Sequence, residues 1–128
     1  MRIINSEGAP AAIGPYSQAV LTGGLLFVSG QIPLDPETGE MASGGIREQT
    51  ERVIGNIEAI LRQAGAGFED VVKTACFLSD MGNFAEFNEI YAKHFTGKPA
   101  RSCVAVRDIP RGALVEIEAV AEVAGYGA

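Results

Sequence analysis

The sequence is poor in the residues that bind metals or form cross-links. Its 128 residues include two cysteines, Cys76 and Cys103, and one histidine, His94. An ordinary zinc site needs several cysteine, histidine or carboxylate ligands close together, so no metal centre is predicted. Both cysteines fall inside runs typical of strands rather than turns. Without a secretion signal they are expected to be reduced, and Cys76 to be a small buried apolar group.

The lone histidine also limits nucleophilic and cofactor chemistry. A Ser-His-Asp triad would have to use His94, which lies in a predicted helix beside Tyr91 and Phe95, where packing or a helix-end role is favoured. The glycine pairs at 23–24 and 44–45 lack the spacing of a phosphate-binding or dinucleotide-binding loop. We therefore expect chemistry without a metal or another cofactor.

Basic residues are scarce relative to acidic ones. Ten lysines and arginines stand against sixteen aspartates and glutamates, a formal net charge of −6. Phosphate binding needs a net basic surface, so nucleic acid is not expected as the main ligand. The nearest approach to a basic patch is the loop that carries Arg107 and Arg111.

Long apolar runs are missing as well. No window approaches the run of about 18 apolar residues that a membrane helix needs. The N-terminus has no apolar core of signal-peptide length, and Glu7 interrupts it early. We therefore expect a cytoplasmic protein with no membrane partner. With 47% hydrophobic and 20% charged residues, the composition predicts one globular domain over residues 1–128.

What is present indicates an α+β domain, a single mixed β-sheet with two helices packed on one face. Proline and glycine exclude a regular helix from residues 8–16. Apolar side chains at helical spacing predict helices over 46–64 and 83–95, the first ended by Gly65 and Gly67 and the second capped by Asp80. Strands are predicted over 17–21, 25–31, 71–78, 101–106 and 114–123.

Each predicted helix has one apolar side. The first is expected to bury Ile46, Val53, Ile54, Ile57, Ile60 and Leu61. The second carries a stripe of aromatic side chains, for which core packing is the expected role of Phe84 and Phe95. The stripe consists of Phe84, Phe87, Tyr91 and Phe95.

The last predicted strand has two unlike faces. Alternation places one apolar set under the helices, namely Val115, Ile117, Ala119 and Ala121. The opposite face carries Leu114, Glu116, Glu118, Val120 and Glu122. Two helices cover only one side of a sheet, so this second face meets water or another subunit. The apolar side chains among the acids predict an oligomer.

One arginine stands on an otherwise small and apolar strand. It is Arg101, in the segment Pro-Ala-Arg-Ser-Cys-Val over 99–104, and the next strand carries Glu116 and Glu118 two residues apart. A guanidinium in such surroundings needs an anionic partner. A small carboxylate, held by two parallel hydrogen bonds, is one candidate, with a glutamate nearby to position a water. A purely structural pair between Arg101 and Glu116 or Glu118 is the other interpretation.

Several segments of the chain resemble blocks of the RidA/YjgF family of reactive-intermediate deaminases. Together they cover nearly the whole length. They are Ala-Pro-Ala-Ala-Ile-Gly-Pro-Tyr-Ser-Gln-Ala over 9–19, Val-Ser-Gly-Gln-Ile-Pro over 28–33 with Gly39, Asn56, Val-Val-Lys-Thr over 71–74, Asn-Glu-Ile-Tyr over 88–91, the Arg101 segment, and Val-Glu-Ile-Glu-Ala over 115–119. Any single block is a weak signal, and their common order is a specific one.

This resemblance implies a fold and an activity. The fold is chorismate-mutase-like, assembled as a homotrimer with active sites in the clefts between subunits. The activity is hydrolysis of reactive 2-imino acids and their enamine tautomers, such as 2-iminobutanoate and 2-iminopropanoate, to 2-oxo acids and ammonia. Dehydratases that use pyridoxal phosphate release such intermediates, but the deaminase itself needs no cofactor.

The resemblance also implies roles for individual residues. Arg101 stands where the family holds the substrate carboxylate, and Glu116 where a glutamate orients the attacking water. Cys103 is expected on the substrate side, with its backbone carbonyl holding the same water, because nothing in the sequence supplies a base to ionise the thiol. Four further residues are expected to bind substrate at the rim or wall of the pocket, namely Tyr16, Ser29, Gly30 and Asn88.

Some alternatives stay open. Tyr16 has a core-packing interpretation, and Asn88 one as a local hydrogen-bonding residue of its helix. A non-catalytic module that binds small carboxylates, or a chaperone-like stress protein, would share the fold. A mutase is a matter of fold analogy only, since the cations that a dianionic substrate needs are not evident. The end of the chain, 124–128, has no assigned role.

Overall fold

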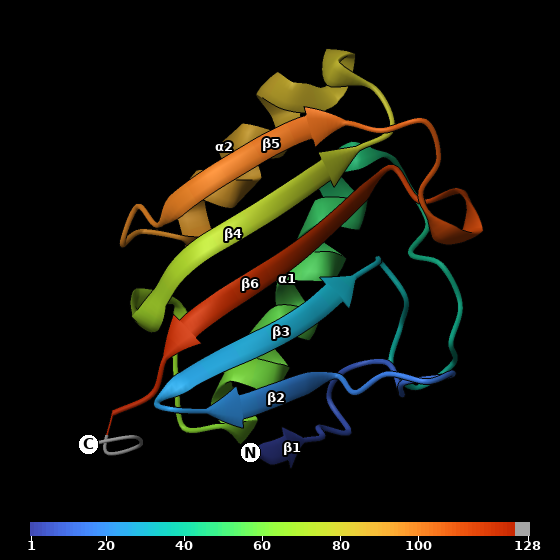
Figure 1. Cartoon of the computed structure of the whole chain (residues 1–128). Helices are drawn as coiled ribbons and strands as arrows, with labels where there is room; N and C mark the ends of the chain where they lie inside the picture. The colour runs from blue at the N-terminus through green and yellow to red at the C-terminus, as the bar shows by residue number, and fades with distance from the viewer. Residues whose placement is uncertain (125–128) are drawn as a thin grey trace.

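The fold is built on one sheet of six strands, shown in Figure 1. The computed structural model describes residues 1–124. The strand order is β1-β2-β3-β6-β4-β5, and every neighbouring pair is antiparallel except β4 and β5. The bounds are β1 (Arg2–Ile4), β2 (Ala19–Thr22), β3 (Leu25–Gln31), β4 (Val71–Leu78), β5 (Ala100–Ala105) and β6 (Val115–Glu122).

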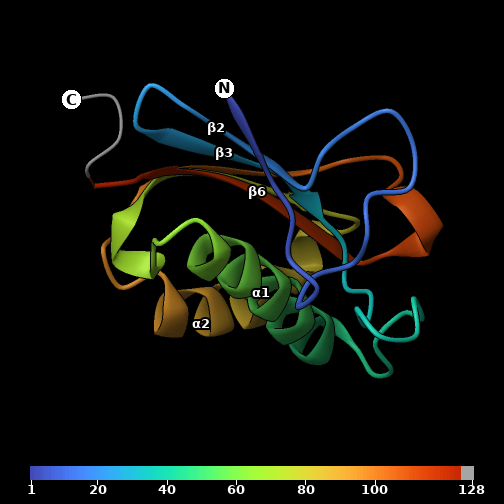
Figure 2. The same cartoon turned by 90° about the horizontal axis from the view of Figure 1, so that it is seen from below.

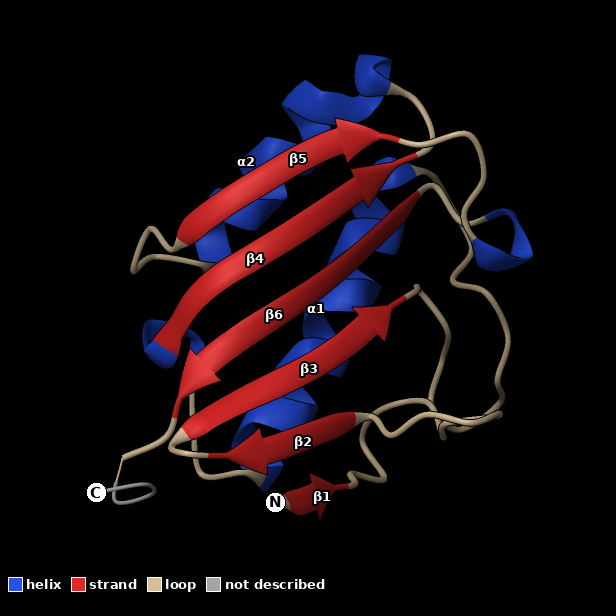
Figure 3. Cartoon of the chain, viewed as in Figure 1, coloured by secondary structure: helices blue, strands red, loops and turns tan. Residues whose placement is uncertain are grey.

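Two α-helices lie on the same face of this sheet. They are α1 (Ile46–Gln63) and α2 (Phe84–His94), and Figure 2 shows both below the sheet with its other side uncovered. Residues 1–124 also form three short 3-10 helices, η1 (Phe68–Asp70), η2 (Met81–Asn83) and η3 (Pro110–Gly112). Figure 3 colours the helices blue and the strands red. The predicted α+β class, with one mixed sheet and two helices on one face, is confirmed.

Helix α1 supplies much of the core. All six apolar residues predicted on its inner side are buried, namely Ile46, Val53, Ile54, Ile57, Ile60 and Leu61. The first turn is closed by Glu48, whose Oε1 accepts a hydrogen bond from the Gly45 N–H at 2.7 Å. The helix ends before Gly65, which has a φ of 81°, a conformation that glycine adopts without strain.

The structure corrects the sequence prediction at three places. Strand β1 was not predicted, because three residues are too few for alternation to be recognised. The strand expected to begin at Ser17 begins at Ala19, since the Ser17 carbonyl accepts a hydrogen bond from the Ser29 hydroxyl instead. Asp80 does not cap α2 itself but the preceding η2, by accepting a hydrogen bond from the Gly82 N–H.

The two faces of the sheet differ, as the alternation of apolar and acidic residues in the last strand predicted. Along β6 the apolar residues 115, 117, 119 and 121 are buried under the helices, and the residues between them are half-buried or exposed. The uncovered side, called the open face below, carries apolar as well as acidic groups. Its exposed side chains include Phe27 on β3 and Val104 on β5, at 45% and 48% exposure. Such exposure on a sheet is typical of a surface that meets another protein.

The described part of the chain also bears on the predictions about membrane helices, metal-binding groups, the two cysteines and His94. Neither α1 nor α2 is long and apolar enough to cross a membrane. Residues 1–124 contain no cluster of three or more metal-binding side chains. Cys76 and Cys103 are both free, although they are neighbours in the β4–β5 register. His94 ends α2, where its ring lies against Phe68 and its Nε2 is 3.1 Å from a carboxylate oxygen of Glu51, in agreement with the expected packing or helix-end role. The tail beyond 124 lies outside the described residues.

Candidate functional site

Arg101 lies on β5, the edge strand of the sheet, with its side chain on the helix-covered side. In register it is next to Thr74 of β4, which is fully buried. The centre of its guanidinium is 4.7 Å from the Tyr91 ring centroid and 5.6 Å from that of Phe84. Its Nη1 donates a hydrogen bond of 2.7 Å to Oδ1 of Asn88 on α2. Aromatic faces and an amide oxygen therefore fix the cation from the inner side.

Tyr91 forms the support of this guanidinium, a role that the sequence did not predict. Its hydroxyl shares a buried hydrogen bond of 2.7 Å with Thr74, and its ring stacks on Phe95 at 4.4 Å between centroids. Burial raises the pKa of the Tyr91 phenol, so the group stays neutral. Thr74 holds the hydroxyl and Phe95 stacks on the ring, so Tyr91 presents a fixed aromatic surface to Arg101.

No carboxylate partners Arg101 anywhere in residues 1–124. The structural pair with Glu116 or Glu118 is therefore wrong for the single chain. Asn88 satisfies one of the five guanidinium donors, which leaves the fork able to grip an incoming carboxylate. Beside it is a cleft of about 560 Å³ between α2 and β5, lined by Asn88, Tyr91, Ala92, Phe95, Thr96, Lys98, Pro99 and Arg101.

Cys103 lies two residues along β5, on the same side of the strand as Arg101. The residue is half-buried. Burial raises the pKa of its thiol, and the charge of Arg101 counteracts this only in part. A thiol in such surroundings is not ionised at neutral pH and is a poor nucleophile. This agrees with a role for the backbone carbonyl rather than for the sulfur.

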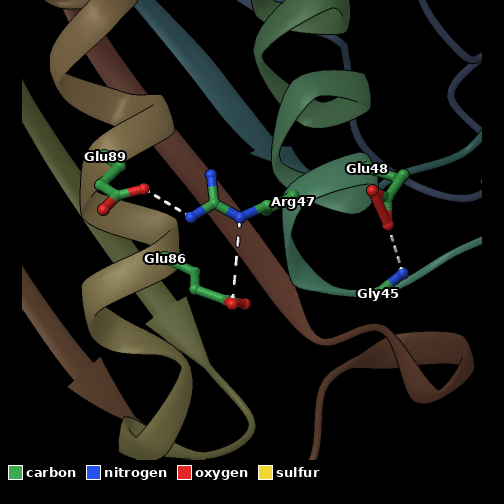
Figure 4. Close-up of polar contacts among 5 residues, drawn as sticks. All are labelled: Gly45, Arg47, Glu48, Glu86 and Glu89. Atoms are coloured by element: carbon green, nitrogen blue, oxygen red, sulfur yellow. Dashed lines mark hydrogen bonds and ion pairs between the residues drawn. The ribbon is translucent and has the colours of Figure 1, made fainter.

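Helix α2, which carries Asn88, is tied to the start of α1 by an ion-pair cluster. Figure 4 shows Arg47 in the first turn of α1 between Glu86 and Glu89 of α2. Arg47 Nε lies 3.9 Å from Glu86, and its terminal nitrogen donates to Glu89. The pairs are solvent-exposed, so each adds little stability, but together they fix the end of α2 that presents Asn88.

Glu116 lies on the other half of the predicted site, where β3 and β6 meet in a bulge. Val28 is paired with Ala119 and Gln31 with Ile117, so β3 uses one residue more than β6 over this stretch. The bulge contains Ser29 and Gly30, both predicted at the pocket rim. Bulges disrupt regular pairing and redirect backbone groups, and they are common beside active sites.

Gly30 makes room for the Glu116 carboxylate. A Cβ added to Gly30 would overlap Oε2 of Glu116 and lie 2.9 Å from its Cδ, so a larger residue would displace the carboxylate. Burial raises the pKa of Glu116, and the neighbouring charge of Glu118 raises it further. Because its pKa is raised, the Glu116 carboxylate is a stronger proton acceptor than an exposed glutamate.

Ser29 and Tyr16 belong to the same half. The Ser29 hydroxyl donates a hydrogen bond of 2.6 Å to the Ser17 carbonyl, which ties the bulge to the opening segment. Tyr16 is 53% exposed, so its core-packing interpretation is wrong. It lines a second cavity together with Gly30. Asn88, in contrast, bonds to Arg101 rather than within its own helix.

The structure brings the predicted residues together as two separate groups rather than one. Arg101, Cys103 and Asn88 lie on the helix-covered side at the β5 edge, whereas Tyr16, Ser29, Gly30 and Glu116 lie around the β3–β6 bulge. In register, Glu116 is next to Phe77 of β4, whose other neighbour is Val104 of β5, on the open face. A sheet therefore separates Arg101 from Glu116 within one chain.

The mixed sheet with two helices on a single face and an uncovered second face defines the class, an α+β protein. A family model described as endoribonuclease L-PSP matches residues 6–123, and the chain belongs to this family, which comprises the RidA, YjgF and RutC proteins.

Curated relatives and solved structures agree with this assignment. The chain is 53% identical over 120 residues to a RutC family protein of Pyrococcus abyssi, covering 93% of this chain and 94% of that protein. It is 46% identical over 121 residues to the 2-iminobutanoate/2-iminopropanoate deaminase of Mus musculus, covering 94% and 90%.

Among structures, a Thermotoga maritima protein has a TM-score of 0.95 at 51% identity, covering 98% of this chain and 99% of that one. E. coli TdcF with bound serine has a TM-score of 0.90 at 40% identity, covering 95% and 98%.

Proposed function

We propose that this chain hydrolyses 2-imino acids such as 2-iminobutanoate and 2-iminopropanoate, with their enamine tautomers, to 2-oxo acids and ammonia. One observation carries the proposal. The Arg101 guanidinium is fixed by Tyr91, Phe84 and Asn88 beside a cleft, and it has no carboxylate partner in the described part of the chain. A planar cation held in this way fits the carboxylate that every 2-imino acid carries.

The proposed site is shared by two copies of the chain in a homotrimer. Arg101 and Glu116 lie on opposite sides of one sheet, so a single substrate reaches both only if another copy contributes one of them. Two features support such an assembly. Arg101 lies on the edge strand β5, which has one free edge, and the open face exposes Phe27 and Val104.

The proposed reaction needs only these groups and water. Arg101 holds the carboxylate and thereby orients the adjacent carbon of the C=N bond. Glu116, together with the Cys103 carbonyl, holds a water whose oxygen bonds to that carbon while Glu116 takes a proton. As the water oxygen bonds to the carbon of the protonated imine, the C=N electron pair moves to the nitrogen, and the resulting carbinolamine nitrogen receives the proton from Glu116. The C–N bond then breaks, the hydroxyl proton passes to Glu116, and Glu116 gives this proton to the departing ammonia. The products are the 2-oxo acid and ammonium.

Two relatives support this choice of substrate. The mouse relative is named as a 2-iminobutanoate/2-iminopropanoate deaminase, and the E. coli relative was solved with serine, a small amino acid with the same carboxylate and α-nitrogen. Imine hydrolysis has a low barrier in water, so positioning and one proton acceptor are enough to accelerate it.

The test uses imines made in place from alanine by an amino-acid oxidase, with semicarbazide added to trap the imine that survives. We expect the protein to lower semicarbazone formation, and Arg101→Ala to abolish this effect because the carboxylate loses its anchor. Circular dichroism of the same preparations reports whether the variant is folded.

The matched control is Arg62→Ala, which removes an exposed arginine of α1 that pairs with Glu58 one turn away. This variant is expected to retain full activity. A fully active Arg101→Ala protein would contradict the proposed anchor. A folded wild-type protein without effect on the trap would contradict the deaminase function itself.

A further inference from the structure

A cavity of about 330 Å³ lies beside the β3–β6 bulge, on the Glu116 half of the site. Tyr16 and Gly30 line it, together with apolar residues of the opening segment and of the loop after β3. Gly30 links this cavity to Glu116, because its missing side chain leaves the space that the carboxylate fills. Of the described residues around the cavity, Arg111 alone carries a charge.

The backbone of Arg111 adopts a conformation that a residue with a side chain rarely takes. In η3 it has a φ of 60° and a ψ of 21°. Lys98 is the other described non-glycine residue with a positive φ, and there the N–H bonds to Phe95 in the turn that follows α2. Glycine would take the conformation of Arg111 without strain, so an arginine in this strained conformation points to a use for its side chain.

The Arg111 guanidinium is oriented but mostly unpartnered. Its Nη1 donates to the Gly39 carbonyl at 3.2 Å, and no carboxylate of residues 1–124 pairs with it. The remaining N–H donors can donate two parallel hydrogen bonds to the oxygens of a carboxylate. Arg107 of the same loop differs on each point. It is 96% exposed, it lies near Asp108 at 3.5 Å, and it is not among the residues that line the cavity.

We propose that Arg111 binds a second carboxylate, so that this chain hydrolyses 2-imino dicarboxylic acids such as 2-iminoglutarate in addition to monocarboxylic ones. The inference rests on the proposed function. Arg101 of one copy holds the carboxylate next to the imine carbon, and Arg111, on the Glu116 half of the next copy, holds the carboxylate of the side chain. The bonds made and broken at the imine are those already described.

The test compares two imines in the same semicarbazide assay, one made from glutamate and one from alanine by amino-acid oxidases. The quantity measured is the ratio of kcat/KM for 2-iminoglutarate to that for 2-iminopropanoate. Arg111→Ala is expected to lower this ratio about tenfold, because one charge-assisted contact is lost for the dicarboxylate only. Arg111→Lys, which keeps the charge, should restore part of it.

Arg107→Ala is the matched control and should leave both rates unchanged. If the wild-type protein hydrolyses 2-iminopropanoate but Arg111→Ala leaves the ratio unchanged, the second carboxylate site is wrong and the deaminase function stands. If the wild type hydrolyses neither imine, the deaminase function is wrong. The Arg111 site is then tested by calorimetry, which compares the affinity of the protein for 2-oxoglutarate with its affinity for 2-oxobutanoate. Preference for the dicarboxylate that disappears in Arg111→Ala supports the site, and equal binding overturns it.

Discussion

At the scale of single residues, the proposed chemistry depends on charged groups whose surroundings are already arranged in the single chain. Arg101 has an aromatic support and an amide partner but no counter-charge, and Glu116 is half-buried with an elevated pKa. Each arrangement is unfavourable for the isolated chain, because a cation without an anion and a partly desolvated carboxylate both raise the free energy of the folded state. Groups of this kind are common in binding and catalytic sites.

The pH dependence of the proposed reaction follows from Glu116. It accepts a proton in its ionised form, so the rate should rise with pH as the raised pKa is passed. Glu118→Gln removes the nearby negative charge and therefore lowers the pKa of Glu116. We expect the acidic limb of kcat/KM to move to lower pH in this variant, in profiles recorded between about pH 4 and 7.

Glu122→Gln serves as the control for this measurement. It removes an exposed carboxylate from the same face of β6, but Glu122 does not contribute to the pKa shift of Glu116. Its acidic limb should coincide with that of the wild type. Identical limbs in the wild type and Glu118→Gln would show that Glu116 does not control the rate.

Sequence reasoning proposed the chemical groups of the candidate site but did not predict their surroundings. Arg101 and Glu116 were predicted from residue type and family resemblance, whereas the support by Tyr91 was not. In the sequence, Tyr91 belongs to an aromatic stripe at helical spacing, which core packing explains equally well. The sequence also did not show that Arg101 and Glu116 lie on opposite sides of the sheet. Their strands are separated in the sheet by β4, and only the pairing register shows on which side each residue lies.

At the scale of secondary structure, the periodic elements were predictable and the irregular connections were not. The helix ranges differ from the observed ones by no more than a residue at either end, because six apolar positions of α1 and the stripe of α2 define their inner sides. The β3–β6 bulge has no periodic signal, since it is an interruption of alternation. Family resemblance indicated Ser29 and Gly30, but their bulged backbone appears only in the register.

Gln18 holds the opening segment in place beside the site. It is 2% exposed, its Nε2 donates to the carbonyls of Ser6, Ala9 and Pro10, and its Oε1 accepts from the Ser6 N–H at 2.7 Å. One side chain thus satisfies several backbone groups of a segment that has no regular structure. Pro10 also lines the cavity that Tyr16 shares with Gly30.

Gln18→Leu should therefore affect both stability and function. Leucine keeps the bulk but leaves buried backbone groups unpaired, so we expect the free energy of unfolding to fall by about 2–4 kcal/mol. The deaminase rate should fall as well, because the segment loses its fixed position. Urea unfolding followed by circular dichroism measures the first effect. Gln63→Leu, at an exposed glutamine of α1, should change stability by less than about 0.5 kcal/mol.

At the scale of the whole molecule, the sheet has a covered side and an open one. The covered side accounts for stability, since the helices and the strands bury one continuous apolar core there. The open face, with its exposed Phe27 and Val104, has no such role in the single chain. Sequence alternation in β6 predicted this asymmetry, because two helices cannot cover both sides of six strands. It could not specify how many copies share the face.

The separation of Arg101 and Glu116 by the sheet has a genetic consequence. If each site takes its arginine from one copy and its glutamate from the next, two inactive variants can complement one another in a mixed oligomer. Each mixed trimer of Arg101→Ala and Glu116→Ala chains would have about a third of its sites with both native residues, which is about a quarter of all sites when the unmixed trimers of a random equal mixture are included. The remaining sites would lack one or both groups.

We therefore expect the mixed trimers from co-expression of the two variants to have about a third of wild-type deaminase activity, although each variant alone is inactive. The measurement is the semicarbazide assay on trimers purified through two different affinity tags, one on each variant. Activity in the doubly tagged fraction would show complementation between subunits. Inactive mixed trimers would mean that both residues of a working site come from one chain, and a defect in either variant would then never be masked by the other.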